Sequence, residues 1–124
     1  MRLVLQRTCL AAGVIGYAAI VALSVVPGSD RPHTGAGGGF EHFAANALVA
    51  GALALGLANM RQRLLALLWL CASAGILEVA QIYIPGRNAE LWGLLTSSAG
   101  ACAGMLAGAV AARSTNPDTE HSHN

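Results

Sequence analysis

Two hydrogen-bonding side chains, Glu78 and Gln81, lie within an apolar stretch that covers residues 64–84. Their spacing of three places both on one face of a helix. A carboxylate inside a membrane-length apolar segment costs on the order of 3 kcal/mol, so a partner, a water pocket or protonation must offset it. Glu78 therefore indicates a polar tie between helices, or a site for binding or acid–base chemistry.

Further polar residues flank other apolar stretches and could face Glu78. His42 and Asn46 are four apart, so they share a helical face, and Arg87 follows in a Pro-Gly-Arg turn. At 1.5 Å per residue, we expect Glu78 roughly 9 Å below the end of its helix near residue 84. The predicted pocket consists of His42, Asn46, Glu78, Gln81 and Arg87.

Two interpretations of this pocket remain open. In the structural one, Glu78 pairs with Arg87 or His42 and ties the helices together, because buried polar groups need partners. In the functional one, the pocket binds the head group of an extracytoplasmic ligand or does acid–base work on it. Glu41, at the interface, is expected to be a solvated residue.

Four apolar segments must position these residues: 8–26, 40–58, 64–84 and 91–112. Each is near membrane-crossing length, and in lipid only helices satisfy their own backbone hydrogen bonds. The segment 40–58 is the weakest candidate for a transmembrane helix, because Glu41, His42 and Asn46 occupy its first turns. We predict an all-α fold, a polytopic bundle of four transmembrane helices over residues 1–113, followed by a disordered polar tail at 114–124.

The links between the segments are short. Residues 27–39 predict a flexible loop, 59–63 a tight polar hairpin and 85–88 a turn. Ala22-Leu23-Ser24 resembles a signal-peptide cleavage site, but the first apolar run exceeds the usual core of about 7–15 residues. We therefore expect the first helix to be retained.

Composition narrows the class of protein. Of the 124 residues 55% are hydrophobic and 10% charged, and the net charge is +1, so nucleic acid is not an expected partner. Cys9, Cys71 and Cys102 each lie alone in an apolar run. This placement is typical of small buried hydrophobic residues and not of metal ligands, which need closer spacing. No phosphate-binding glycine loop, nucleophile elbow or paired catalytic carboxylates appear. We assign no catalytic residue, metal or cofactor.

The arginines predict an orientation. With the amino terminus inside, five arginines are cytoplasmic and only Arg31 and Arg87 lie outside, in accord with the positive-inside rule. Both termini are then cytoplasmic and the polar pocket faces outward. The five are Arg2, Arg7, Arg61, Arg63 and Arg113.

The fourth segment carries a stripe of small residues. They are spaced by four, three, four and four, which lets helix backbones approach closely in lipid. The pattern does not say whether the partner helix belongs to this chain or to another protomer. The stripe consists of Gly93, Ser97, Gly100, Gly104 and Gly108.

Several of these motifs resemble the VanZ-like membrane proteins. The matching stretches are Ser24-Val25-Val26-Pro27, Glu41-His42-Phe43-Ala44 and above all the run of residues 75–87, with its Glu-x-x-Gln and Pro-Gly-Arg. The resemblance implies a four-helix membrane domain in bacteria, and the founding member is associated with low-level resistance to a glycopeptide antibiotic. The chain departs from the family at Gly38 and Gly39, where Asp-Lys is usual, and at Gly93 and Ser97, where Asp and Asn are usual.

The leading functional prediction is a non-enzymatic component of the cell envelope in the bacterial inner membrane. It would bind an envelope ligand or a membrane-protein partner at the outward pocket, with Arg87 pairing an anionic group. One alternative is a membrane enzyme acting on a lipid-linked or cell-wall substrate, with Glu78 or His42 as general base. Another is an assembly subunit that docks through its glycine stripe.

Overall fold

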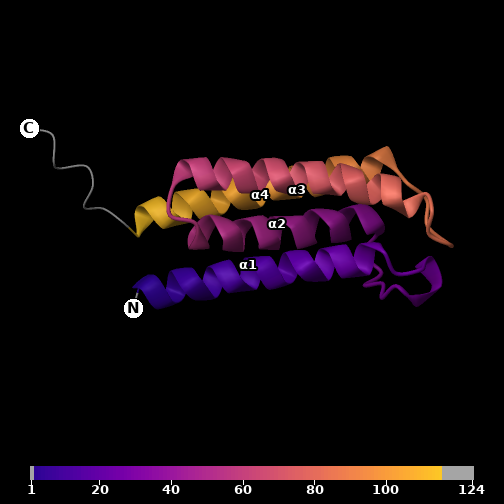
Figure 1. Cartoon of the computed structure of the whole chain (residues 1–124), viewed down its shortest axis with the longest axis horizontal. Coiled ribbons are helices and arrows are strands. Elements are labelled where there is room, and N and C mark those ends of the chain that lie inside the picture. The colour runs from indigo at the N-terminus through magenta and orange to yellow at the C-terminus, as the bar shows by residue number, and fades with distance from the viewer. Residues whose placement is uncertain (1, 116–124) are drawn as a thin grey trace, which may run out of the picture.

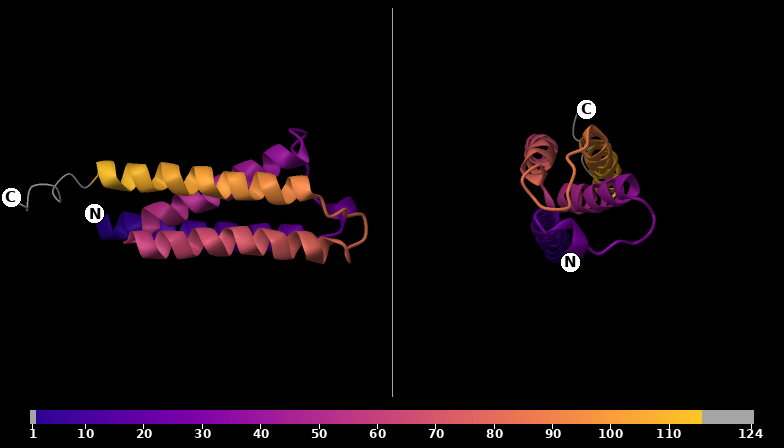
Figure 2. Two further views of the ribbon diagram at one scale, coloured as in Figure 1. Left: turned by 90° about the horizontal axis from the view of Figure 1, so that it is seen from above. Right: turned by 90° about the vertical axis from the view of Figure 1, so that its right-hand side faces the viewer.

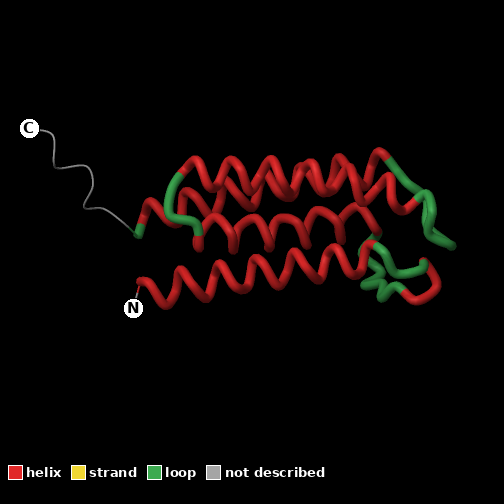
Figure 3. Tube along the Cα trace, viewed as in Figure 1, coloured by secondary structure: helices red, strands yellow, loops and turns green. Residues whose placement is uncertain are grey.

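The computed structural model describes residues 2–115, which form four long helices and no strand (Figures 1 and 3). The predicted all-α class is confirmed. Apart from Ser114 and Thr115, the tail predicted at 114–124 lies outside the described residues. The helices are α1 (Arg2–Ser24), α2 (Gly38–Gly56), α3 (Met60–Gln81) and α4 (Leu91–Ser114), with one short 3-10 helix, η1 (Gly28–Asp30).

Consecutive helices run in opposite directions along one bundle. α1 begins and α4 ends at the same end, while the loops 25–37 and 82–90 meet at the other (Figure 1). Seen end-on, α2 lies between α1 on one side and α3 with α4 on the other (Figure 2). This topology brings every residue of the predicted pocket to the end of the bundle that carries the two longer loops.

Three of the four helices are long and apolar enough to cross a membrane: α1, α3 and α4. The expectation of four such helices is wrong for α2, because Glu41, His42 and Asn46 in its first half lower its hydropathy. Many large apolar side chains point outward, among them Ile15 and Leu68 at 68% and 66% exposure. Three apolar helices with this outward-facing surface indicate a membrane protein.

The helix boundaries correct two local predictions. Residues 59–63 do not form a hairpin: Asn59 caps α3, its Oδ1 accepting from the N–H of Gln62 at 2.9 Å. Arg63 therefore lies within α3, buried. At the other end α3 stops at Gln81 and not at residue 84. Glu78 is consequently only about 4.5 Å from the end of its helix, half the predicted depth.

α2 and α4 pack more closely than any other pair, through the glycines of α4. A Cβ at Gly100 or Gly104 would overlap a carbonyl oxygen of α2, that of Phe43 or Ala47 respectively. At Gly108 it would lie 2.6 Å from the Gly51 carbonyl oxygen. All five residues of the predicted stripe are buried. Gly100, Gly104 and Gly108 thus pack on α2 of the same chain, while Gly93 faces Glu78 of α3. Docking of another protein through the stripe would require a surface that these two helices already cover.

The core formed by this close packing is built from small side chains. Ala50 and Ala54 of α2 are fully inaccessible, and Leu70 of α3 is the one large side chain below 2% exposure among the described residues. α1 joins the other face of α2, where Gly13 and Gly16 lie against Leu53 and Val49. Backbone proximity, more than bulky side chains, holds the bundle together.

Candidate functional site

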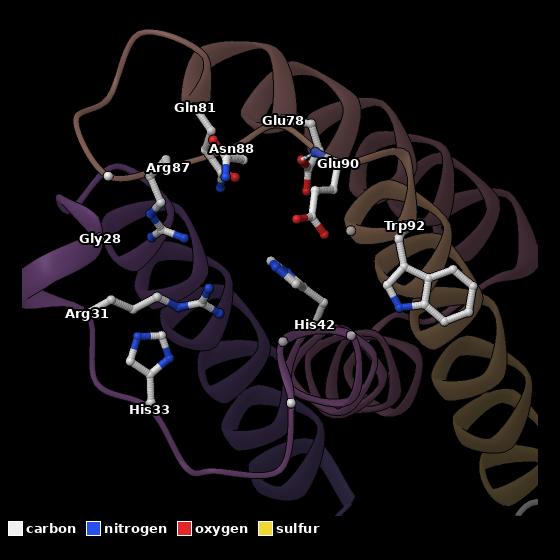
Figure 4. Close-up of a pocket in the computed structure, with 15 residues that line it drawn as sticks. Gly28, Arg31, His33, His42, Glu78, Gln81, Arg87, Asn88, Glu90 and Trp92 are labelled. Carbon is white, nitrogen blue, oxygen red and sulfur yellow. Dashed lines mark hydrogen bonds between the residues drawn. The ribbon is translucent and has the colours of Figure 1, made fainter.

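A polar cleft of about 580 Å³ opens at the end of the bundle where α1 and α3 finish (Figure 4). Residues from both loops and from α2, α3 and α4 line it. Of the predicted pocket residues, His42, Glu78, Gln81 and Arg87 are in the lining. The complete lining consists of Gly28, Arg31, His33, Gly37, Gly38, Gly39, His42, Glu78, Gln81, Gly86, Arg87, Asn88, Glu90, Trp92 and Gly93.

Glu78 forms one wall of the cleft and joins α3 to the start of α4. Its Oε2 accepts a hydrogen bond from the backbone N–H of Glu90 at 3.0 Å. Its Oε1 occupies the space that a side chain at Gly93 would fill, since a Cβ there would overlap this oxygen. Gly93 therefore makes room for the carboxylate.

The structural interpretation expected Glu78 to pair with Arg87 or His42. Within residues 2–115, neither side chain forms a hydrogen bond or an ion pair with it. The backbone of the α3–α4 loop holds the carboxylate instead. Among the described residues Glu78 accepts this one hydrogen bond, and its side chain lines the cleft, so acceptor capacity is left for a bound molecule.

Gln81 and Arg87 hold the end of α1. Gln81 Nε2 donates to the carbonyl oxygen of Ser24 at 3.3 Å, and Arg87 Nε donates to that of Val26 at 3.1 Å. Arg87 Nη2 donates to the carbonyl oxygen of Leu23. Carbonyls at a helix C-terminus lack partners within the helix and carry partial negative charge, so an amide and a guanidinium are well suited to them. These contacts give α1 a defined place in the folded bundle.

Arg87 still carries its charge in this position. Burial, and secondarily the charge of Arg31, lowers the pKa of Arg87, while Glu78 acts in the opposite direction. An arginine side chain cannot be deprotonated in a protein, so this lowering leaves the charge of Arg87 in place. The guanidinium retains N–H groups beyond the two that hold α1, which leaves donors for a ligand in the cleft.

Arg31 faces Arg87 from the α1–α2 loop, and Glu41 fixes it. Arg31 Nη2 lies 3.3 Å from Glu41 Oε2. Glu41 Oε1 accepts from Thr34 as well, from the backbone N–H at 2.8 Å and from Oγ1 at 2.7 Å. The expectation that Glu41 is a solvated surface residue is therefore wrong: it ties the loop to the first turn of α2.

His42 points into the middle of the cleft. Figure 4 shows its ring between the side of Arg31 and Arg87 and the side of Glu78 and Glu90. Within residues 2–115 the ring has no hydrogen-bond partner, since the hydrogen bond of Asn46 goes to the backbone carbonyl of His42. A ring nitrogen of His42 is therefore available to a bound molecule.

Asn46 does not line the cleft, although the sequence placed it there. It is buried, and its Nδ2 donates to the carbonyl oxygen of His42 one turn earlier at 2.9 Å. It lines a small polar cavity of about 20 Å³ beneath the cleft, together with Ser97 and Ser73. A space of that size holds about one water molecule. Ser97 thus faces Asn46 inside the bundle.

Sequence reasoning missed Arg31, His33, Glu90 and Trp92 in the cleft. All four lie in the loops or at the first turn of α4, where no helical period assigns them a face. Their one available signal was location, since polar residues of the two outer links must meet at the same end of an antiparallel bundle. Among residues 2–115, no group of three or more His, Cys, Asp or Glu side chains is arranged to hold a metal ion.

The fold and the cleft together define a class: a helical membrane protein with a charged hollow at one end of its bundle. Comparisons of the chain with protein-family models, with curated proteins and with solved structures found no match.

Proposed function

We propose that this chain is a VanZ-like, non-enzymatic component of the bacterial cytoplasmic membrane that binds an anionic group of an envelope ligand in the outward-facing cleft. In this proposal α2 is a fourth membrane-embedded helix, packed against α1 and α4 on its buried faces and exposing Leu48 to the acyl chains. Its 19 residues give a length of nearly 30 Å. Of the polar residues in its first half, His42 lines the cleft, Glu41 binds the α1–α2 loop and Asn46 is buried inside the bundle.

The arrangement of the arginines supports the outward direction of the cleft. Arg2, Arg7, Arg61, Arg63 and Arg113 all belong to the end of the bundle opposite the cleft. An excess of arginine marks the cytoplasmic side of a membrane protein. With that end in the cytoplasm, both termini are cytoplasmic and the cleft opens outside.

One observation carries the binding proposal: the cleft has a positive side and a negative side with an unpartnered imidazole between them among the described residues. Arg31 and Arg87 occupy one side, and Glu78 and Glu90 the other (Figure 4). Polar groups at the end of an apolar bundle are costly unless they are solvated or paired. Here the proposed ligand pairs its anionic group with the arginines, while the carboxylates accept hydrogen bonds from its hydroxyl or amino groups.

This differs in detail from the role expected for Arg87 alone. Two N–H groups of Arg87 already hold α1, so we assign the anion to Arg31 and Arg87 jointly, with His42 as a third donor. Glu78 and Glu90 determine which ligands bind, because they would repel a ligand that carries negative charge at both ends. The selected ligand class therefore carries its anion at one side of the head group.

The enzyme alternative rests on Glu78 and His42. Both line the cleft, but no hydrogen bond joins them in the part of the chain that the structure describes. A general base acts through a proton in hydrogen-bond reach, so catalysis would require a substrate that bridges the two. Binding needs no such bridge, and it is the simpler use of this geometry.

The test uses Glu78→Gln and His42→Ala in cells that depend on this chain. The amide oxygen introduced by Glu78→Gln can still accept from the Glu90 N–H, so this change removes charge while keeping the loop contact. We expect both variants to keep normal abundance by immunoblot and to alter sensitivity to a glycopeptide antibiotic. Asp30→Asn, which removes a carboxylate outside the cleft lining, is the matched control and should change neither. The pocket proposal is finished if Glu78→Gln and His42→Ala also change neither.

A further inference from the structure

A second hollow adjoins the polar cleft. It is a groove of about 400 Å³ between the last turns of α1 and the first half of α2. Its walls include Ile20 and Leu23 of α1 and Ala45 and Leu48 of α2, with Phe40 at the loop end. Phe40 and Leu48 are 64% and 75% exposed, so the groove is open on the outer surface of the bundle, where acyl chains would surround it.

Three polar residues line both hollows: Arg31, His42 and Arg87. The groove therefore leads from apolar walls to the positive side of the cleft. Glu41, which pairs with Arg31, lines the groove as well, so two arginines and one carboxylate leave a net positive charge at the junction. A molecule that filled both would need an apolar chain at one end and an anion at the junction. That is the chemistry of an amphiphile, in which the phosphate of a lipid lies beside the arginines.

We propose that the ligand of the cleft is a phosphate-bearing lipid, with its chain in the α1–α2 groove and its head group in the cleft. The inference rests on the proposed function, which it deepens by naming the ligand class. The phosphate lies between Arg31 and Arg87, and His42 donates to it. The hydroxyl or amino groups of the head reach Glu78 and Glu90 on the opposite side.

Another apolar groove on the bundle shows why the charged residues, and not the apolar walls, identify the ligand as one with a phosphate. It measures about 640 Å³ and lies among α1, α2 and α4, with Ala52 and Ala107 in its walls. No charged residue of the described chain lines it. Nothing there would distinguish a lipid with a phosphate from any other acyl chain, whereas the α1–α2 groove ends at two arginines. This uncharged groove supplies a matched control on the same helix.

The experiment measures binding of three probes to the purified full chain in dodecyl maltoside, by native mass spectrometry. The probes are didecanoyl phosphatidylglycerol, the chain-free head glycerophosphoglycerol, and didecanoylglycerol, which lacks the phosphate. We expect the whole lipid to bind about tenfold or more tightly than either part, because both hollows must be filled at once.

Variants locate the binding. Ala45→Leu should block the α1–α2 groove and weaken the lipid about tenfold, and Arg31→Gln should do the same through the lost phosphate contact. Ala52→Leu adds the same side chain seven residues later on α2, in the uncharged groove, and should leave affinity unchanged. If Ala45→Leu does not fold, a series of chain lengths on the unmodified protein replaces it, with affinity expected to rise with chain length.

The outcomes separate the two proposals. Equal affinity for glycerophosphoglycerol and the whole lipid, with no effect of Ala45→Leu or chain length, overturns the lipid inference and leaves a polar ligand in the cleft. Equal affinity for didecanoylglycerol, with no effect of Arg31→Gln, also overturns it, because apolar contact alone would explain binding. Absence of binding by every probe overturns the lipid inference, while the cell-based test of Glu78 and His42 still judges the cleft.

Discussion

Replacing Gly104 by Ala tests whether backbone proximity between α2 and α4 holds the bundle together. A methyl group at Gly104 would overlap the carbonyl oxygen of Ala47, and a backbone atom has no rotamer by which to move aside. Overpacking costs about 1–3 kcal/mol, and we expect the upper half of that range here. The same change gains about 1 kcal/mol in helix propensity. The net effect is a loss of about 1–2 kcal/mol in the free energy of unfolding.

Gly51→Ala is the matched control on the opposite side of the same interface. Its Cβ would lie 3.5 Å from the nearest atom, the carbonyl oxygen of Gly104, which is ordinary contact. Only the propensity gain of about 1 kcal/mol then applies, so this variant should be slightly stabilised. The two alanine variants should differ by about 2–3 kcal/mol, roughly 30- to 150-fold in the unfolding equilibrium constant.

The assay is unfolding of the purified protein in mixed micelles with increasing dodecyl sulfate, followed by tryptophan fluorescence. Trp92 reports directly on the interface, because its indole lies against Gly39 at the start of α2. A Trp69→Phe background removes the second tryptophan. Equal unfolding midpoints for Gly104→Ala and Gly51→Ala would refute the reasoning, since the tight glycine contact would then carry no energetic weight.

Three further predictions concern the arginines and the topology. Arg87→Met should lower the free energy of unfolding by about 1.5–3 kcal/mol, because it leaves two carbonyls of the α1 end without their charged donor. Arg61 is exposed, so Arg61→Met should leave the free energy of unfolding unchanged. Titration with dodecyl sulfate compares the two variants. Arg63→Met should cost a similar amount in the same titration, because Arg63 donates to the carbonyls of Ala54 and Leu57. In a chain without its native cysteines, a Cys in place of Ser29 should react with an impermeant maleimide in intact cells and one at Gln62 should not; the reverse pattern inverts the orientation.

The helical fold could be predicted from the sequence because membrane-length apolar runs leave the backbone few options. The helix ends could not, and Arg63 shows why. A polar cluster at 59–63 is typical of a connection, yet Asn59 supplies a cap and the Arg63 side chain turns back onto the end of α2. A buried arginine that serves two carbonyls has no signature in a hydropathy pattern. The low hydropathy of α2 could have been predicted, because the polar residues in its first half are visible in the sequence.

The residues of the cleft could likewise be predicted only in part from the sequence. Periodicity placed Glu78 and Gln81 on one face, and antiparallel topology placed His42 and Arg87 near them, so these four could be named in advance. The pairings among them could not be, because they depend on loop paths. The partner of Glu78 is a backbone N–H at residue 90, and Arg87 serves α1. Asn46 shows that a shared helical face does not ensure a shared cavity, since it turns beneath the cleft.

The two arginines that close helix ends act over very different distances along the chain. Arg63 donates to carbonyls six and nine residues earlier, so the contacts at the end of α2 can form as soon as the α2–α3 hairpin has been synthesised. Arg87 reaches carbonyls 61 and 64 residues earlier. During biosynthesis the α2–α3 hairpin can therefore complete itself as it leaves the ribosome, while the far end of α1 waits for the loop after α3. The lining of the cleft spans residues 28 to 93, so the cleft is complete only once the first turn of α4 has been added.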